Sequence, residues 1–242
     1  MPKKQYVVSY LGTGLVAFIS LFLTTLLWQQ PVLLTVLLGI LIAFVLLLWK
    51  NEQDLWLFLF AMIAGPLFDF VATATNTWQY GKADFFGVPL WLPFLYGLAG
   101  VYIVKVAQEI RRQLGEKTKK EPFWKYMIGN IVAVVVLVIS GIIWNNPLLL
   151  TGVLLVFSIG LYLLWQEETI ILVYIFAMIV GPIFDMIATK TGAWYYPMPD
   201  FLDIPIWLPL LYGLAAIYVT KGSEFIENYF MKKISLKNWI RV

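Results

Sequence analysis

The stretch AMIAGPLFDFVATATNTWQY at residues 61–80 recurs as AMIVGPIFDMIATKTGAWYY at residues 177–196. A shift of 116 residues aligns the two copies without a gap, and 25 of 45 positions are identical between residues 61–105 and 177–221. An internal repeat of this length predicts that the chain consists of two halves that fold alike.

The composition indicates an integral membrane protein. Hydrophobic residues make up 61% of the 242 residues and charged residues 13%, while the mean hydropathy is +0.83. Because a soluble domain carries about 25% charged residues, this chain has too little polar surface to cover its apolar residues in water. A lipid environment removes that need.

The apolar segments predict an all-α polytopic membrane helix bundle with eight transmembrane helices. Each segment is long enough to cross a hydrocarbon core of about 30 Å, and none shows the two-residue alternation of a membrane strand. The segments are residues 6–28, 31–49, 55–74, 88–107, 125–144, 147–165, 169–189 and 204–221. Pro31 and Pro147 follow short polar breaks and are well placed to open the next helix of a hairpin.

Basic residues predict the orientation of these spans. They gather before the first span, after the fourth and after the eighth, at Lys3, Lys4, Arg111, Arg112, Lys117, Lys119, Lys120, Lys125, Lys232, Lys233, Lys237 and Arg241. The positive-inside rule therefore predicts that both termini are cytoplasmic, and we expect the plasma (inner) membrane. The first apolar run is expected to be a retained span and not a cleaved signal peptide.

Four spans in each half give the two halves the same orientation, with a pseudo-twofold axis along the membrane normal. The predicted domains are a first four-helix repeat at 1–107, a basic cytoplasmic connector at 108–124, a second four-helix repeat at 125–221 and a cytoplasmic tail at 222–242. Ile226, Phe230 and Ile234 recur at four-residue intervals in the tail. This spacing favours an amphipathic helix at the membrane surface, and a solvated tail is the alternative.

The chain has no cysteine and no histidine. This excludes disulfides and cysteine nucleophiles and removes the commonest metal ligand, so no metal and no cofactor are expected. The net charge of +3 lies in the regions that set topology, and no nucleic-acid partner is predicted.

Asp69 and Asp185 are the leading candidates for a functional site. Each occupies the same place in its repeat, about 20 Å into an apolar span, where a carboxylate must face the bundle interior or a wet cavity. A proline three residues earlier frees a backbone carbonyl, and Thr73 and Thr189 follow four residues later on the same helical face. Together these groups could bind a proton, a cation or a polar group of a substrate. Alternatively, each Asp caps the following loop or pairs with Lys82 or Lys190.

Aromatic residues complete the candidate site. Trp78, Tyr80, Trp91 and Tyr96 in the first half recur as Trp194, Tyr196, Trp207 and Tyr212 in the second. They could form the belt that Trp and Tyr make at membrane surfaces, or they could line a substrate pocket together with Asp69, Thr73, Asp185 and Thr189.

The repeated segment resembles the lycopene cyclase domain family of carotenoid biosynthesis. Asp185, Ala188, Thr189, Gly192, Trp194 and Tyr196 fit the first sequence element of that family, and Ile204-Pro205 and Gly87-Val88-Pro89 fit the start of the second. The resemblance implies a tandem helical unit with a cleft for a hydrophobic ligand. The glutamate pair that follows the proline in that family is replaced by Trp91-Leu92 and Trp207-Leu208, so Asp69 or Asp185 would have to serve as the catalytic acid.

Three functions remain open from the sequence. The first is binding, and movement, of a small or hydrophobic lipid-like or isoprenoid-like substrate at the interface between the repeats. The second is a cofactor-free membrane cyclase or isomerase acting on a carotenoid or another isoprenoid. The third is a non-catalytic assembly subunit of the membrane. The expected partners are membrane lipid and a hydrophobic small molecule, and a homo-oligomer is possible.

Overall fold

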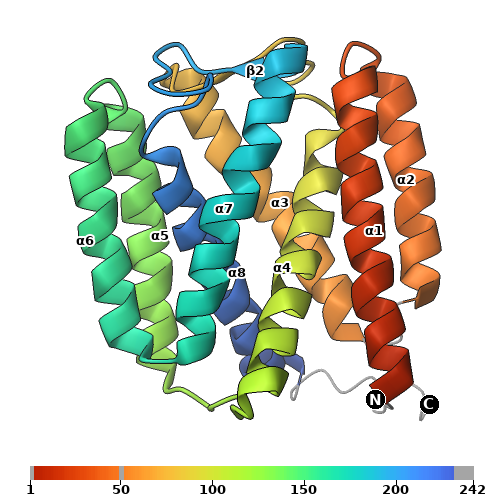
Figure 1. The fold of residues 1–242 in the computed structure, drawn as a ribbon, viewed down its shortest axis with the longest axis vertical. Helices are drawn as coiled ribbons and strands as arrows, with labels where there is room; N and C mark the ends of the chain where they lie inside the picture. The colour runs from red at the N-terminus through yellow and green to blue at the C-terminus, as the bar shows by residue number, and fades with distance from the viewer. Residues whose placement is uncertain (1–2, 49–51, 232–242) are drawn as a thin grey trace.

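The computed structural model describes residues 3–48 and 52–231, and these residues form helices and two short strands joined by loops (Figure 1). The elements are α1 (Lys3–Leu27), α2 (Pro31–Leu48), α3 (Glu52–Ala74), β1 (Gln79–Tyr80), α4 (Leu92–Leu114), α5 (Phe123–Ile143), α6 (Pro147–Trp165), α7 (Glu168–Thr191), β2 (Trp194–Tyr195), α8 (Leu208–Phe225) and the π-helical turn η1 (Ile226–Met231). The predicted all-helical class is confirmed.

Local sequence sets the ends of several helices. Asn146 caps α6, because its side-chain oxygen accepts a hydrogen bond from the backbone N–H of Leu149 at 3.2 Å, and Pro147 takes the first helical position, where no N–H is needed. Gly115 and Gly192 end α4 and α7 in the left-handed conformation, with φ of 70° and 79°. Glycine adopts this conformation without steric cost.

The fourth and eighth helices begin later than the sequence predicts, at Leu92 and Leu208 instead of residues 88 and 204. The residues before them form a tight turn, in which Phe85 bridges to Val88 and Phe201 bridges to Ile204. Proline follows within the first turn of each helix. Its missing N–H is one of those that a helix start leaves unpaired, so it opens the helix and does not break it.

Within residues 3–48 and 52–231, five helices are long and apolar enough to cross a membrane by length and composition. They are Tyr10–Leu27 of α1 and the full lengths of α3, α5, α6 and α7, while the apolar part of α2, Pro31–Leu46, is shorter. Helices α4 and α8 carry buried ionic side chains, among them Lys105 and Lys221, and are less apolar. The chain is therefore an integral membrane protein, and the crossing of all eight helices as two repeats stays a prediction.

The helices form a central group with a helical hairpin on each flank. Figure 1 shows α1 and α2 on one side, α5 and α6 on the other, and α3, α4, α7 and α8 between them. Helix α3 packs on α4 and α7 packs on α8, while α1 packs on α4 and α7, and α5 packs on α8 and α3. Helices at equivalent positions in the two halves therefore make equivalent contacts.

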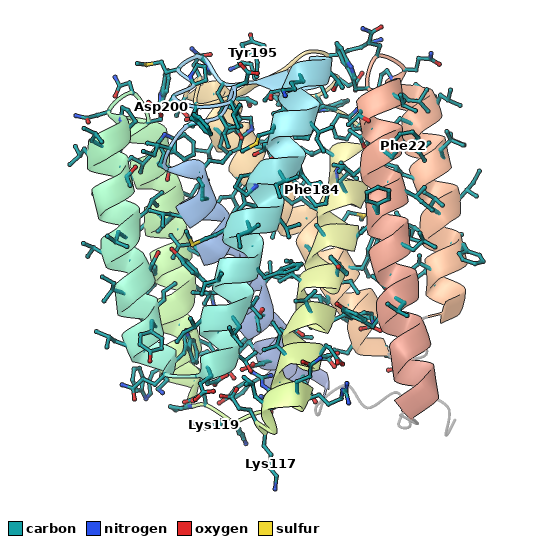
Figure 2. The ribbon with its side chains drawn as sticks, in the orientation of Figure 1. Phe22, Lys117, Lys119, Phe184, Tyr195 and Asp200 are labelled. Carbon is teal, nitrogen blue, oxygen red and sulfur yellow. The ribbon has the colours of Figure 1, made fainter. Side chains whose placement is uncertain are left out.

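The outer surface of the bundle is apolar. Phe22 on α1 is 56% exposed and Leu148 on α6 is 76% exposed. Many leucines and isoleucines along the same helices are also exposed. In Figure 2, Lys117 and Lys119 point away from one end of the bundle, whereas Tyr195 and Asp200 lie at the other end. A wide apolar band between two polar ends is the surface expected for helices in lipid.

The regions predicted as connector and tail are partly helical. Helix α4 continues through Leu114, so Arg111 and Arg112 lie in its last turn, where basic side chains interact favourably with the helix dipole. Helix α8 continues through Phe225, and the ring of Tyr229 packs against Phe225 with centroids 5.4 Å apart. Residues 232–242, with Ile234 and the basic residues of the tail, lie outside the described residues.

Candidate functional site

A cavity of about 820 Å³ lies in the centre of the bundle and is lined by residues of α1, α3, α4, α5, α6, α7 and α8. Most of its lining is apolar, including Ala99 and Ala215, which expose their methyl groups to it. Phe184, labelled near the middle of the bundle in Figure 2, is also part of the wall. Polar side chains gather at the end where α3 and α7 finish.

Asp69 lies at this end and is completely buried. It comes five residues before the end of α3, and its Oδ1 accepts hydrogen bonds from the indole N–H of Trp78, at 2.8 Å, and from the hydroxyl of Tyr80. The hydroxyl of Tyr96 also interacts with this carboxyl group. Oδ2 receives no well-formed hydrogen bond from the described residues.

Asp185 has the same partners in the second half and is 2% exposed. The indole N–H of Trp194 donates to Oδ1 at 2.9 Å, and the hydroxyl of Tyr196 donates to Oδ2 at 2.8 Å. The hydroxyl of Tyr212 interacts with the same group. Here both carboxyl oxygens accept well-formed hydrogen bonds. The two sites therefore have the same residue types but differ in the number of carboxyl oxygens that are hydrogen-bonded.

Glycine makes room for the tyrosine of each site. A Cβ atom on Gly65 would lie 2.1 Å from Cγ of Tyr96, and one on Gly181 would lie 2.3 Å from Cγ of Tyr212. Real Cβ atoms do not approach so closely. The glycine of each Gly-Pro pair therefore lets α4 and α8 place a tyrosine ring directly against the helix that carries the Asp.

Strands β1 and β2 bring the two sites together. They pair in antiparallel fashion, with Tyr80 opposite Trp194. The rings of Tyr80 and Trp194 lie 6.0 Å apart, and those of Trp78 and Tyr196 lie 6.2 Å apart, both edge to face. We call Asp69 and Asp185 with their Trp and Tyr partners the paired acid sites, and both border the same end of the cavity.

Tyr80 and Tyr196 remain protonated donors. Burial raises the pKa of each phenol well above its ordinary value of 10, and the neighbouring Asp69 or Asp185 raises it further. Loss of the phenol proton would put a second negative charge beside a buried carboxyl group.

Eight of the twelve predicted site residues line the cavity, and four do not. Those that line it are Asp69, Trp78, Tyr80, Tyr96, Asp185, Trp194, Tyr196 and Tyr212. The hydroxyls of Thr73 and Thr189 instead donate to carbonyls of their own helices, at Asp69 and Met186. Trp91 and Trp207 are each 1% exposed and belong to the packed core.

Lys82 and Lys190 do not form ion pairs with the paired acid sites in the described part of the chain. The ammonium of Lys82 donates to the backbone carbonyl of Gln29 at 2.9 Å, and the carboxyl groups take their hydrogen bonds from indole and phenol groups. Groups of three or more His, Cys, Asp or Glu side chains that could hold a metal are also absent from residues 3–48 and 52–231.

A buried ionic network at the opposite end of the bundle was not predicted from the sequence. Arg111 donates to Glu167 at 2.9 Å and to Glu224 at 2.7 Å, and Lys221 donates to the same two carboxylates at 2.7 and 2.9 Å. The ammonium of Lys221 also lies 4.6 Å from the centre of the Trp165 ring. The network joins the end of α4 to the second half, and its two positive charges balance its two negative charges.

The paired acid sites can accept hydrogen bonds from neutral donors. Their oxygens face indole and phenol groups and not cations, and the cavity beside them is apolar. A hydroxyl group on a largely apolar molecule fits this arrangement, because it can donate to a buried oxygen while the rest of the molecule contacts hydrocarbon.

The fold of this protein is similar to that of a membrane protein of known structure. No protein-family model matches the sequence, and no curated protein matches it significantly. The structure is similar to that of a mycobacterial Insig homologue, MvINS from Mycobacterium vanbaalenii, with a TM-score of 0.64 and 16% sequence identity. The match covers 75% of this chain and 97% of that chain, and a cross-linked MvINS trimer matches with the same values.

This similarity corrects the relationship inferred from the sequence. The fold is that of the Insig homologue, and neither the structural matches nor any family model supports a lycopene cyclase domain. The residues that suggested the relationship included Asp185, Trp194 and Tyr196. In the structure, Asp185 joins Trp194 and Tyr196 through hydrogen bonds, and this bonding accounts for their spacing without cyclase chemistry.

Proposed function

We propose that this protein binds a lipid-like molecule in its central cavity and recognises a hydroxyl group of that molecule at the paired acid sites. The observation that carries the proposal is the combination of a cavity of about 820 Å³ with an apolar wall and two buried carboxyl groups at one end. A volume of this size lies within the range of small-molecule sites, which typically combine an apolar wall with a few polar groups.

Asp69 is the stronger of the two recognition groups. Its Oδ2 is buried without a well-formed hydrogen bond from the described residues, whereas both oxygens of Asp185 have donors. A buried acceptor without a well-formed hydrogen bond costs free energy that a ligand hydroxyl would recover. An anionic head group would have no cationic partner there, because the described residues around the two carboxyl groups supply indole and phenol donors and no Lys or Arg.

The similarity to MvINS supports the coarser part of the proposal, a helical membrane protein of the same fold. One MvINS structure is a cross-linked trimer, and we extend the proposal to a homo-oligomer of this chain. We also propose that all eight helices cross the plasma membrane as two repeats with both ends cytoplasmic, in line with the basic residues at one end of the bundle.

The test compares two ligands that differ by one hydrogen-bond donor. A primary alcohol of about 16 carbons and its methyl ether are bound to the purified protein in detergent, and their affinities are measured by competition. We expect the alcohol to bind about tenfold more tightly, in the range of one hydrogen bond to a charged group. Asp69→Asn should reduce this preference, because an amide oxygen is a weaker acceptor than a carboxylate.

Asp84→Asn is the matched control. Asp84 accepts a hydrogen bond from the backbone N–H of Leu90 in an exposed loop and does not line the cavity, so its variant should keep the wild-type preference. Equal binding of alcohol and ether to the wild type would overturn the proposed role of the carboxyl groups. A preference that Asp69→Asn leaves unchanged would assign recognition to another group.

A further inference from the structure

The cavity is lined by two sets of residues that are related by the 116-residue shift, and we call the parts of the cavity beside them its two arms. One arm lies between α1, α4 and α7, and the other lies between α5, α8 and α3. Ala17, Tyr102 and Phe176 line the first arm, and Ala133, Tyr218 and Phe60 line the second. Each residue of the first set is 116 positions from its counterpart in the second. The parts of the two arms that these residues line therefore correspond.

The arms differ in depth. On the first side the lining ends at Ala17 of α1 and Ile103 of α4. On the second side it continues beyond their counterparts, Ala133 and Val219, to Tyr126 of α5 and Ile226 after α8. The extra depth is seven residues along each helix, or about 10 Å at the rise of an α-helix. We call the second side the deep arm and the first the shallow arm.

One tyrosine closes the shallow arm. The ring of Tyr102 lies against Gly14, where an added Cβ would be 2.9 Å from its Cε2 atom, and it stacks on Tyr10 with ring centres 6.3 Å apart. The counterpart of Gly14 is Asn130, which has a side chain in the corresponding space. Tyr218, the counterpart of Tyr102, instead packs on Phe60 at 6.3 Å.

The floor of the deep arm is aromatic. The Tyr126 ring lies 5.2 Å from that of Trp165 and 5.4 Å from that of Phe225, and all three residues line the arm. Lys221 lines it as well, but Glu167 and Glu224 already neutralise its charge. The other charged residue on the lower wall, within the described part of the chain, is the exposed Glu52. The three rings offer a hydrocarbon chain an apolar contact surface at the end of this arm.

We propose that the deep arm holds the hydrocarbon chain of the bound lipid, with the chain end at Trp165 and Phe225, and that each protein binds one such chain. This inference rests on the proposed function, because it takes the hydroxyl end of the same ligand to lie at the paired acid sites. It makes Gly14 and Asn130 the residues that decide which arm is open. The hydrocarbon chain of the ligand therefore lies beside α5 and α8, which belong to the second half of the protein.

The test uses a primary alcohol of about 18 carbons that carries a diazirine at the end of its chain. After irradiation of the purified protein, the labelled residues are found by peptide mass spectrometry. We expect labels at Tyr126–Asn130, Trp165 and Phe225–Ile226 in the wild type. Asn130→Trp, which fills the deep arm, should abolish these labels and weaken binding of the long alcohol at least tenfold. It should change the affinity of an alcohol of about 8 carbons less than twofold.

Two further variants sharpen the result. Ile131→Trp adds a large side chain at a neighbouring position that is 56% exposed on the outer face of α5, and it should keep the wild-type labels. Tyr102→Ala should open the shallow arm and add labels at Tyr10–Gly14. Gly129→Leu is a second way to fill the deep arm, because a Cβ there meets only Trp165, at 3.6 Å.

The outcomes separate the two proposals. Labels in the shallow arm of the wild type, or labels that both Asn130→Trp and Gly129→Leu leave in place, would overturn the assignment of the chain to the deep arm while leaving ligand binding intact. A wild type that binds neither alcohol and shows no label in the cavity would overturn the proposed function itself.

Discussion

At the scale of single residues, each paired acid site depends on a glycine as much as on an acid. Gly65 and Gly181 contribute no side-chain hydrogen bond, yet they give Tyr96 and Tyr212 the space to reach the carboxyl groups. The Gly-Pro pair of the repeated segment is therefore explained by close packing against the neighbouring helix. Close packing of this kind leaves no room for even one methyl group.

Gly65→Ala tests this packing. The added methyl group would overlap the Tyr96 ring, and overpacking of this kind costs about 1–3 kcal/mol of stability. We expect a lower midpoint in thermal unfolding followed by circular dichroism in detergent. Gly39→Ala in α2 is the matched control, because a Cβ there has nothing within 4 Å, and it should leave the midpoint unchanged or raise it. Equal midpoints for Gly65→Ala and the wild type would contradict the packing explanation.

At the scale of elements, the connector between the halves holds the start of α7. Glu116 accepts hydrogen bonds from the backbone N–H of Glu168 at 3.1 Å and from the hydroxyl of Thr169 at 2.6 Å. A carboxylate at this place pairs free N–H groups of the helix and interacts favourably with its dipole. A residue 52 positions away in sequence thus serves as a helix cap.

The Glu116 cap should depend on pH. Partial burial alone would raise the pKa of Glu116, but hydrogen bonds from Thr169 and Glu168 and the charge of Arg111 outweigh it, so the pKa lies below its ordinary value of 4.5. A carboxyl group with a lowered pKa in the folded state stabilises the fold above pH 4.5, and the contribution is lost as the pH falls through the lowered value.

We therefore expect Glu116→Gln to lower stability by about 0.5–1 kcal/mol at pH 7 and to have a smaller effect at acidic pH, measured as the difference in thermal midpoint from the wild type. Glu168→Gln, at a neighbouring exposed position, is the matched control and should have the weaker effect at pH 7. A Glu116→Gln effect that is the same at pH 7 and at acidic pH would show that the carboxylate charge plays no part.

At the scale of the whole molecule, the sequence predicts the helical class, and eight of its twelve candidate site residues border the cavity. Asp69 stands out because a carboxyl group in an apolar span needs polar partners, and Trp78 and Tyr80 follow it at the same spacing in both halves. Side-chain direction was harder to predict. Thr73 shares a helical face with Asp69 but bonds to its own helix, and Trp91 points into the core.

Contacts between helix ends that are far apart in the chain could not be predicted from the sequence. Arg111 and Lys221 share Glu167 and Glu224, and this network has no counterpart under the 116-residue shift because the position equivalent to Glu167 is Asn51. The unequal depth of the two arms also arises from a sequence difference between the two halves. It depends on Gly14 and Asn130, which differ between the halves in a region where the repeat is less similar.

Binding in the central cavity is the central claim, and native mass spectrometry of the protein released from detergent tests it most directly. We expect wild-type protein to carry a bound lipid-like molecule of defined mass. The double variant Ala99→Phe with Ala215→Phe, which fills the cavity at two equivalent positions, should lose it. Ala43→Phe, at an exposed position of α2 outside the cavity, should keep it. Equal amounts of bound molecule in all three proteins would contradict binding in the cavity.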